Sequence, residues 1–418
     1  METATPTAPP KRCPHHARAA DSPPKDVGKW VAIRDLWREP FRVFFPLAVV
    51  AGTIGVAVWP LVLWGKIETF PNVVHARLMI MGFMGAFVFG FLGTSIPRLL
   101  ETRPLQAFET IPLALVHMGM IACYTANRIA WGDGLLVTNV ALLSIVLGHR
   151  FLTRQDLPAP GFAMILPAFA CLLGGLYIAH LGRKDLLEPE WELLFRSLSY
   201  HGFVLLCLLG AGGFLLPRFL GTGIRRKFPA GRIPSRPWLG GAAIALAGGL
   251  AIGGTYALDA FHHPPLGASL RAVLVTGYLC WEIPFERLRF TWSGVQWLLL
   301  TGIACLPIGI ATAGWFPGLR VSMAHVELVG GFSLITLAVA SRIVYGHSGN
   351  RERLERFHPW ITAAAVLVVL GLLSRLAGDL WPRLMLSHYI YGALCWMAGL
   401  IVWATVVLPK VLKPDPEA

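Results

Sequence analysis

The amino-acid sequence predicts an all-α membrane protein with about twelve transmembrane helices. Hydrophobic residues make up 55% of the 418 residues and charged residues only 14%, against about 25% charged residues in an ordinary soluble domain. The mean hydropathy of the chain is +0.60. A soluble chain of this length would form roughly two or three domains with charged surfaces, and this composition does not supply such surfaces. A helical integral membrane protein is the fold class that remains.

Apolar stretches long enough to cross the hydrocarbon core of a bilayer recur along the chain. A spanning helix needs roughly 20 apolar residues. Backbone polar groups in lipid must be hydrogen-bonded internally, and the two-residue alternation of barrel strands is absent, so each stretch is interpreted as a helix. Those at 134–152 and 266–284 are short for a span. The expected helices are 43–64, 74–97, 108–130, 134–152, 161–181, 193–220, 237–258, 266–284, 292–313, 320–345, 359–377 and 384–410.

Basic residues are distributed unevenly along this topology. The chain has 36 Lys and Arg against 23 Asp and Glu, a net charge of +13, which in a soluble protein would suggest a nucleic-acid partner. With the N-terminus inside, the inner segments hold 26 of the basic residues and the outer segments hold 10. Such a bias is typical of cytoplasmic loops. We therefore expect both termini in the cytoplasm, contact with the lipid bilayer and no nucleic-acid partner.

The domain organisation follows from the same pattern. Residues 1–40 are polar and rich in proline, and they lack the apolar core of a signal peptide. We expect a disordered basic cytoplasmic tail there. Residues 41–411 form the twelve-helix transmembrane domain, and residues 412–418 form a short cytoplasmic tail.

Three histidines at regular spacing predict an internal repeat. His75, His201 and His325 are 126 and 124 residues apart, and each lies near the outer end of an expected helix. Each is followed by a Gly-Phe step and then by an arginine near the inner end, namely Arg98, Arg218 or Arg342. Internal repeats are frequent in large membrane proteins. We expect three four-helix units at 41–155, 160–285 and 290–411.

These histidines are candidate metal ligands. The topology places His75, His201, His325 and also His388 at similar depth in the outer half of the membrane. Ionisable residues inside a membrane usually face the protein interior, and neutral imidazole binds haem iron and copper. A hydrogen-bonding core histidine is the alternative for each of them. No two of these histidines share a helix at i, i+3 or i+4 spacing, so a metal site would have to assemble across helices.

Five charged residues accompany the histidines. Arg98, Arg218 and Arg342 are expected either to anchor helices at the lipid headgroups or to bind haem propionates or another anionic ligand, because guanidinium pairs with carboxylate bidentately. Arg77 and Glu327 each lie two residues beyond a repeat histidine. They are expected to support the metal ligands or to handle protons, or else to form an ion pair that fixes helix packing.

Three stretches of the chain resemble the NnrS family. The segment VVHARLMIMGFMGAFVFGFLGTSIPRL (73–99) resembles the second helix of these proteins, with an early histidine and a Gly-Phe step. The segment AHVELVGGFSLITLAVASRIVYGHSGN (324–350) is similar to the family pattern of a histidine, Thr-Leu-Ala-Val, Ser/Thr-Arg and Gly-His-Ser/Thr-Gly. The segment WREPFRVFFPLA (37–48) resembles the start of the family. Helix number and topology agree along nearly the whole chain after residue 37.

The resemblance implies a multi-pass protein of the bacterial inner membrane that carries haem and copper and takes part in the response to nitric oxide. Nitric oxide or a metal-nitrosyl species would be its ligand, and a respiratory protein would be its electron donor. No Cys-x-x-Cys-His attachment site is present, so a b-type haem is expected. Whether the protein turns over its ligand or only binds it is open. The residues that match the family pattern are His75, His325, Arg342, Gly346, His347 and Gly349.

Two details of the match bear on the metal ligands. Family members often have His-Ala-His-Glu where this chain has His75-Ala76-Arg77-Leu78, so a second histidine and an acid are missing. His347 joins the candidate metal ligands through the match, whereas its position alone would make it a loop histidine at the end of a basic segment.

Other functions also fit the sequence. A proton-coupled secondary transporter would have twelve helices and buried charges, although it would be expected to divide into two six-helix halves. A structural subunit of a respiratory complex is a third hypothesis. The helix number and the positions of the histidines also resemble the architecture of haem-copper oxidases.

Overall fold

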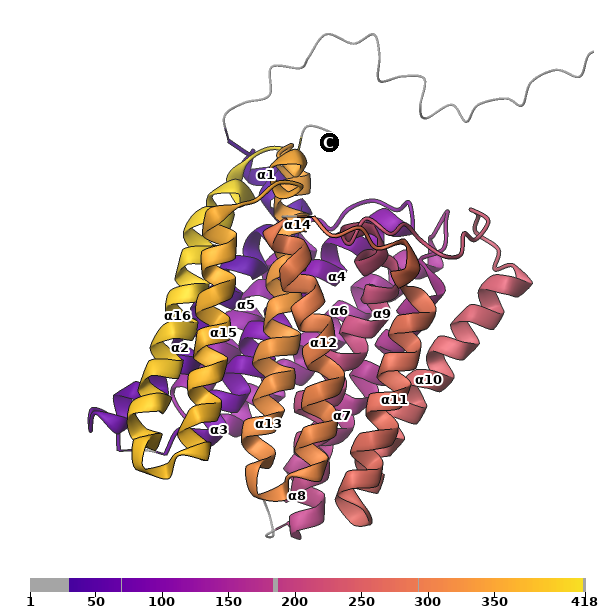
Figure 1. Cartoon of the computed structure of the whole chain (residues 1–418). Coiled ribbons are helices and arrows are strands. Elements are labelled where there is room, and N and C mark those ends of the chain that lie inside the picture. The colour runs from indigo at the N-terminus through magenta and orange to yellow at the C-terminus, as the bar shows by residue number, and fades with distance from the viewer. Residues whose placement is uncertain (1–29, 69, 183–186, 292, 416–418) are drawn as a thin grey trace, which may run out of the picture.

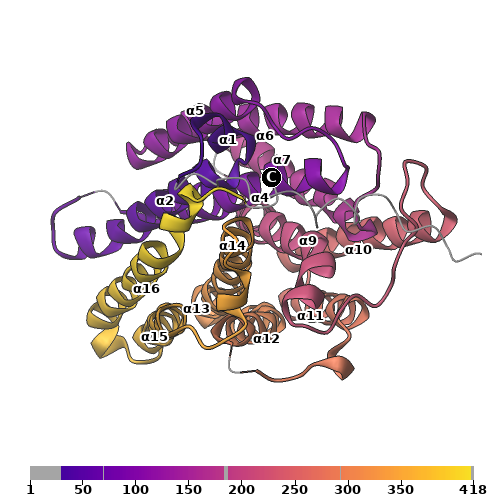
Figure 2. The same cartoon turned by 90° about the horizontal axis from the view of Figure 1, so that it is seen from above.

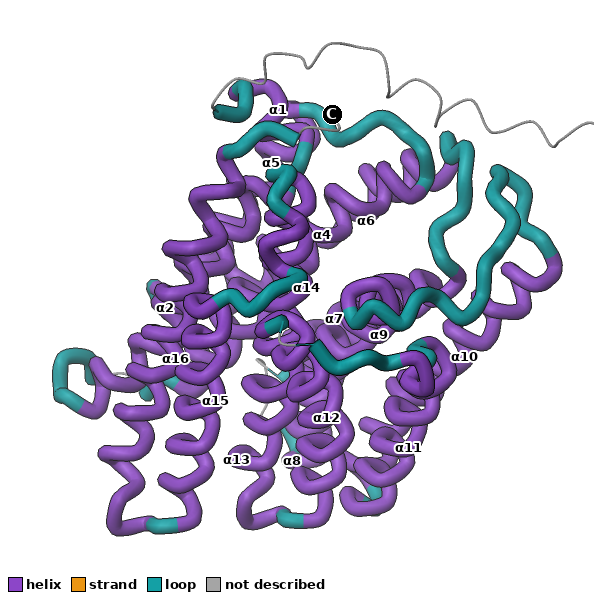
Figure 3. Tube along the Cα trace, turned by 45° about the horizontal axis from the view of Figure 1, so that its top comes forward, coloured by secondary structure: helices purple, strands orange, loops and turns teal. Residues whose placement is uncertain are grey.

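The computed structural model describes residues 30–68, 70–182, 187–291 and 293–415, and it confirms the predicted fold class. In this part of the chain the long elements are all helices, and they stand side by side in one bundle (Figure 1). Loops gather at the two ends of the bundle (Figure 3). The disordered tail expected for residues 1–40 lies outside the described residues as far as position 29. Residues Ile33–Arg38 form a short helix, α1, which the expectation missed.

Twelve helices cross the bundle in the described residues. The first four are α2 (Phe41–Leu63), the composite α3–η2–α4 (Asn72–Arg77, Leu78–Met84, Gly85–Leu99), α5 (Ala107–Thr125) and α6 (Ile129–Leu152). The next four are α7 (Ile165–Leu181), α8–η4–α9 (Pro189–Arg196, Ser197–Gly202, Phe203–Phe219), α10 (Arg236–Phe261) and α11 (Pro264–Glu282). The last four are α12 (Gly294–Trp315), α13–η7–α14 (Arg320–His325, Val326–Ser333, Leu334–His347), α15 (Pro359–Leu380) and α16 (Met385–Val407).

Short 3₁₀ turns join or extend these helices. They are η3 (Pro160–Met164), η5 (Phe285–Arg287), η6 (Pro317–Leu319), η8 (Arg351–Leu354), η9 (Pro382–Leu384) and η10 (Leu408–Leu412). Several begin with proline, whose fixed φ suits a first helical position and whose missing N–H costs nothing there.

Eleven of the helices in the described chain are long and apolar enough to cross a membrane. The twelfth, α11, occupies the short stretch expected at 266–284, but it carries Arg271 in its interior. That guanidinium is buried and pairs with Asp259 of α10 at 2.8 Å. Burying an ion in a bundle requires such a partner, so α11 packs beside α10 (Figure 1) in spite of its lower hydropathy.

Both ends of the described chain lie at the same end of the bundle (Figure 1). The backbone N–H of Val31 donates to the carbonyl of Leu412 at 2.8 Å. An even number of crossings requires this arrangement. We call this end the terminal end and the opposite end, where α3, α8 and α13 begin, the histidine end. Which of the two faces the cytoplasm stays a prediction.

Three composite helices form the centre of the bundle (Figure 2), and we call α3–η2–α4, α8–η4–α9 and α13–η7–α14 the central helices. In their apolar windows 78%, 67% and 67% of the residues are buried, against 28–44% in the other spans. Each central helix contains a π-helical segment, η2, η4 or η7. Such segments are rare and occur often at functional sites. His75 precedes η2 by three residues, His201 lies within η4 and His325 directly precedes η7.

In the third central helix, His347 and not Arg342 occupies the position that Arg98 and Arg218 occupy in the other two. Arg98 and Arg218 each lie 16 residues beyond the glycine of their Gly-Phe step, in the last turn of α4 and α9. In the third central helix the residue 16 positions beyond Gly331 is His347. Arg342 lies more than a turn before the end of α14. The shared π segments and this spacing support the threefold division of the chain, which remains a proposal.

Gly309 of α12 allows close approach to the third central helix, and this contact can be tested. A Cβ at position 309 would lie 2.4 Å from the backbone nitrogen of Glu327. We expect G309A to lower the Tm of the detergent-solubilised protein, because overpacking costs about 1–3 kcal/mol. In the matched variant G254A the new methyl meets nothing within 4 Å, and alanine is favoured over glycine in a helix. Its Tm should be unchanged or higher, and equal Tm values for the two variants would contradict this packing.

Candidate metal centre

His75 and His325 share a hydrogen-bonding arrangement at the histidine end. The Nδ1 of His75 lies 2.7 Å from the carbonyl of Gly55 in α2, and the Nδ1 of His325 lies 2.7 Å from the carbonyl of Val321 one turn earlier. A carbonyl oxygen only accepts, so the ring proton is on Nδ1 in both residues. Their Nε2 atoms therefore carry lone pairs. A metal-binding histidine is usually fixed in this way by a hydrogen bond from its other nitrogen.

These two histidines lie near each other although 250 residues separate them. His325 is close enough to His75, Arg375 and Asp379 to interact with them electrostatically, and His75 interacts in the same way with Arg375. The ring of Trp59 packs edge-on against His75 with centroids 6.1 Å apart. The first and third central helices thus bring the two imidazoles within electrostatic range of each other, and their joint role as metal ligands stays a prediction.

His201 has a different role in the structure. Its Nδ1 lies 2.8 Å from Oε2 of Glu327, the residue two positions beyond His325. Glu327 is 3% exposed, and its Oε1 atom has no hydrogen-bond partner among the described residues. The contact joins the second and third central helices. His201 is therefore coupled to the third central helix through a carboxylate and not through the His325 ring.

His388 lies on α16 and faces α15. Its Nδ1 is 3.1 Å from the hydroxyl of Ser374, which also donates to the His388 carbonyl at 2.9 Å. Its ring packs edge-on against Tyr391. In the described chain these contacts involve neither His75 nor His325. A site shared by all four histidines of matched depth stays a prediction.

The ion pair and hydrogen bonds of Arg77 are made with residues other than Glu327. Its guanidinium pairs with Asp133 of α6, with a shortest N–O distance of 2.9 Å, and donates to the Tyr200 hydroxyl at 2.7 Å. The Tyr124 hydroxyl donates to the same aspartate at 2.8 Å. Arg77 is 2% exposed, so the pairing offsets the large cost of a charge in the membrane interior. Arg77 joins the first central helix to α6 and to the second central helix.

Two further clusters of one arginine, one aspartate and one tyrosine lie at the histidine end. Each joins an arginine to an aspartate, at 2.8 Å for Arg271 and Asp259 and at 2.7 Å for Arg375 and Asp379. In each, the guanidinium lies 4.1 Å from the centre of a tyrosine ring, a cation–π contact. Sequence reasoning missed these residues, although charges inside or beside apolar stretches were a signal for them. The tyrosines are Tyr256 and Tyr389.

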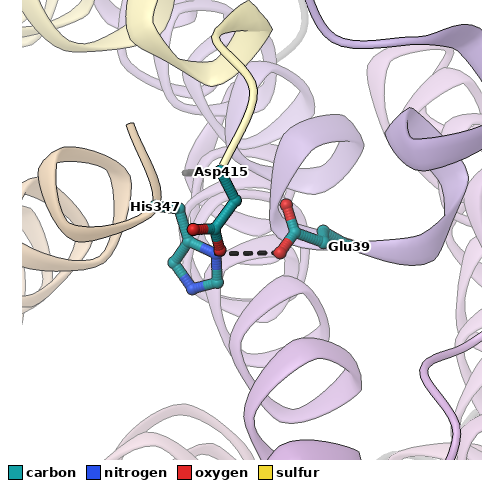
Figure 4. A group of neighbouring side chains, drawn as sticks. All are labelled: Glu39, His347 and Asp415. Carbon is teal, nitrogen blue, oxygen red and sulfur yellow. Dashed lines mark hydrogen bonds and ion pairs between the residues drawn. The ribbon is translucent and has the colours of Figure 1, made fainter. Parts of the chain in front are cut away.

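A second cluster of metal-ligating side chains lies at the terminal end (Figure 4). Glu39, His347 and Asp415 each place a ligand atom within 4.8 Å of the others. The Nδ1 of His347 is 2.8 Å from Oε1 of Glu39 and 3.1 Å from Oδ2 of Asp415. The three residues come from the loop before α2, the end of α14 and the chain segment after α16. Sequence reasoning named only His347, because the acids lie far away along the chain in segments expected to be tails.

Two arginines neutralise this cluster. Arg98 binds both Glu39 and, at 3.0 Å, Asp415. Arg42 is buried and donates to Glu39 at 2.6 Å and to the carbonyl of Lys413 at 2.7 Å. Two carboxylates therefore face two guanidinium groups as well as the His347 ring. The arrangement clamps the two ends of the described chain together at the end of the first and third central helices.

Arg218 and Arg342 do not join this cluster. Arg218 donates to the carbonyl of Phe214 at 2.6 Å and lies over its ring, and Arg342 reaches the carbonyl of Phe219 at 3.4 Å. Of the three arginines expected near anionic groups, Arg98 is the one that the described contacts place on carboxylates.

The carboxylate of Glu39 can be tested as the centre of this clamp. Its burial raises the pKa, but the hydrogen bond from His347 and the charges of Arg42 and Arg98 outweigh burial, so the Glu39 pKa lies below its ordinary value. We expect E39Q to destabilise the protein by about 3 kcal/mol and to lower the Tm, since it leaves the buried guanidinium of Arg42 without its carboxylate. Because the folded-state pKa is lowered, the stabilisation is present above the ordinary carboxyl pKa. It is lost as the pH falls through the lowered value.

The matched control for E39Q is E286Q. Glu286 forms an exposed ion pair with Arg225 at 2.9 Å, and exposed pairs contribute little to stability. E286Q should leave the Tm near that of the wild type at every pH. If E39Q and E286Q have the same Tm, the terminal clamp does not stabilise the fold.

Comparison with known families agrees with this architecture. The family model of the NnrS protein matches residues 35–414, from α1 to the segment that carries Asp415. No curated protein matches the chain. The matched range includes all twelve crossing helices, His75 and His325, and ends one residue before Asp415. The chain therefore belongs to the NnrS family.

Proposed function

We propose that this protein binds haem in the membrane through His75 and His325 and acts in the response of the cell to nitric oxide. The observation that carries the proposal is the pair of imidazoles with Nδ1 fixed by backbone carbonyls and Nε2 available. Membership of the NnrS family supports it. Nitric oxide or a metal-nitrosyl species is the proposed ligand, and a respiratory protein is the proposed electron donor.

The residues at the histidine end fit a haem iron. Both ligands would be neutral imidazoles on central helices, with their orientation set by Gly55 and Val321. A haem held by two histidines would supply electron transfer, and it would bind a diatomic gas where one of the two histidines gives up its place on the iron. The protein would contribute the positions of the rings, and Trp59 beside His75 would limit access of water. Arg375 lies near both rings and is paired with Asp379 at 2.7 Å, so a carboxylate of the haem would have to share this guanidinium.

The family resemblance also implies copper, and its ligands are less well defined in this chain. His201 and His388 bond through Nδ1 to Glu327 and Ser374, so their Nε2 atoms remain open to a metal, as in His75 and His325. Arg77 stands where family members often have a histidine, and its charge is directed to Asp133. At the terminal end both carboxylates of the cluster pair with arginine. We therefore propose haem as the metal cofactor, and His201 and His388 are the remaining histidines that a copper ion would use.

The buried polar residues around the haem ligands have a proposed supporting role. Glu327 bridges His201 to the third central helix, and its free Oε1 offers a place for an ordered water. Arg77 with Asp133 and Tyr200 holds the first central helix against the second. These groups position the helices that carry the iron ligands. A proton-coupled transporter has no comparable support, because the family match and the histidine pair both favour haem binding.

Haem binding can be tested by optical spectroscopy. The wild-type protein, purified in detergent from haem-replete cells, should show a Soret band that shifts on addition of nitric oxide without oxygen. We expect H75A and H325A each to reduce the ratio of haem to protein at least tenfold, because each removes a residue that would hold the iron. A colourless wild-type preparation would overturn the proposal.

Two further histidine variants act as controls for this test. H180A removes an exposed histidine of α7 and should leave the band unchanged. H388A removes a ring bound to Ser374 and should also retain it. Monodisperse elution of all four variants would show that haem loss does not reflect misfolding. Equal loss of haem in H388A and H75A would contradict the assignment of His75 and His325 as the ligand pair.

A further inference from the structure

The three central helices border an apolar cleft that extends along the bundle. Side chains of α4, α9 and α14 line it, together with Phe45 of α2, and these three helices lie at the centre of the view from above (Figure 2). On α9 the lining extends from Val204 to Leu216, twelve residue steps that cover roughly 18 Å of helix. One leaflet of a bilayer contains about 15 Å of hydrocarbon, half of a core of about 30 Å. The apolar cleft is therefore about as long as the acyl-chain region of one leaflet.

A polar hollow lies beyond the apolar cleft at the terminal end. The end of α4, the end of α14, the turn η8 and the segment after α16 contribute to its lining. Three guanidinium groups, two carboxylates and one imidazole line it. They belong to Arg98, Arg351, Arg353, Glu352, Asp415 and His347. Arginines therefore outnumber acids in the polar hollow, before any charge on the imidazole is counted.

The cleft and the hollow are aligned, because two of the central helices line both. Phe91 of α4 and Ala340 of α14 line the cleft. The residues seven positions further along these helices are Arg98 and His347, which line the hollow. Seven residues are close to two turns of an α-helix, so the two residues of each pair share a helix face and lie roughly 10 Å apart along the axis. An elongated ligand with an apolar part and a polar part matches this arrangement.

Two arginines of the polar hollow have no acidic partner. Among the described residues, neither Arg351 nor Arg353 forms an ion pair. Each lies near another cation, since Arg351 is within electrostatic range of Arg342 and Arg353 is within range of Lys410. Like charges held close together repel each other, and a bound anion offsets that repulsion. These side chains therefore favour an anionic ligand.

The two acids of the polar hollow leave these arginines available. Asp415 binds Arg98 at 3.0 Å and lies 3.1 Å from Nδ1 of His347, within the cluster shown in Figure 4. Glu352 is exposed and forms no ion pair within the described part of the chain. The positive charge on η8 is therefore available to a ligand.

We propose that the apolar cleft and the polar hollow together bind one anionic phospholipid, with an acyl chain in the cleft and the phosphate in the hollow. The chain is assigned from the apolar lining and the length of the cleft. The phosphate is assigned from Arg351 and Arg353, because guanidinium pairs with phosphate bidentately and basic pockets between transmembrane helices bind anionic headgroups. Such a lipid would join η8 to the three central helices. The proposal does not depend on haem binding.

Native mass spectrometry of the full-length protein in detergent tests the headgroup. Phosphatidylglycerol should bind at least tenfold more tightly than phosphatidylcholine with the same acyl chains. We expect R351Q and R353Q each to weaken phosphatidylglycerol binding about fivefold and to leave phosphatidylcholine binding unchanged. The matched control is R356Q, which removes an exposed arginine of the same segment outside the hollow. Equal affinity for the two lipids, or an equal loss in R356Q, would overturn the proposal.

The acyl chain has its own test. We expect A211L to weaken phosphatidylglycerol binding at least fivefold, because the added atoms occupy the apolar cleft. A247L, the same substitution at an exposed position of α10 outside the cleft, should bind as the wild type does. If A211L does not fold, L208F replaces it. Glycerol phosphate, which carries the phosphate without the chains, should not displace the lipid. Displacement by glycerol phosphate, or unchanged binding in the folded cleft variant, would contradict a site that holds both parts of a phospholipid.

Electron cryomicroscopy of the protein in phosphatidylglycerol nanodiscs locates the lipid directly. The map should show a phosphate within hydrogen-bonding distance of Arg351 or Arg353 and a continuous chain among α4, α9 and α14. An empty hollow, or a lipid whose chain lies outside the cleft, would rule the site out.

Discussion

The fold depends on the pairing of ionisable side chains inside an apolar bundle. A charge in the membrane interior is too costly to leave unpaired, and Arg77, Arg271 and Arg375 each have an aspartate within 3 Å. Asp133 thereby fixes α6 against the first central helix, and Asp259 holds α11 against α10. Glu327 binds His201 and fixes the second central helix against the third. These pairs determine how the helices are rotated, which apolar packing alone leaves variable.

The bundle has two ends connected by the same central helices. His325 lies in the first turns of the third central helix and His347 ends it, and the 22 residue steps from one to the other span roughly 33 Å of helix. At one end lie the two imidazoles that we propose as metal ligands. At the other, Glu39 and Asp415 join His347 to Arg98 and hold the ends of the described chain together.

Composition and hydropathy predicted the fold class, the number of crossings and the even topology, because the membrane dictates the length and apolarity of every span. The depth of His75 and His325 was also predictable from their positions along the helices. Sequence position does not give the rotation of a helix about its axis, so the partners of His201 and His388 were not foreseen. Glu39 and Asp415 were missed for a related reason: they lie in segments that read as tails and meet His347 only in the folded bundle. The length of the π segments was also not predictable. The position of His347 opposite Arg98 was therefore not predictable either.

The central claim is that His75 and His325 bind one iron together. Electron paramagnetic resonance of the oxidised protein, with and without ¹⁵N-labelled histidine, tests it most directly. A low-spin ferric signal with hyperfine coupling to two histidine nitrogens is the predicted result, and it should be lost in H75A and in H325A. A signal with coupling to a single histidine, or one unchanged in either variant, would contradict the claim.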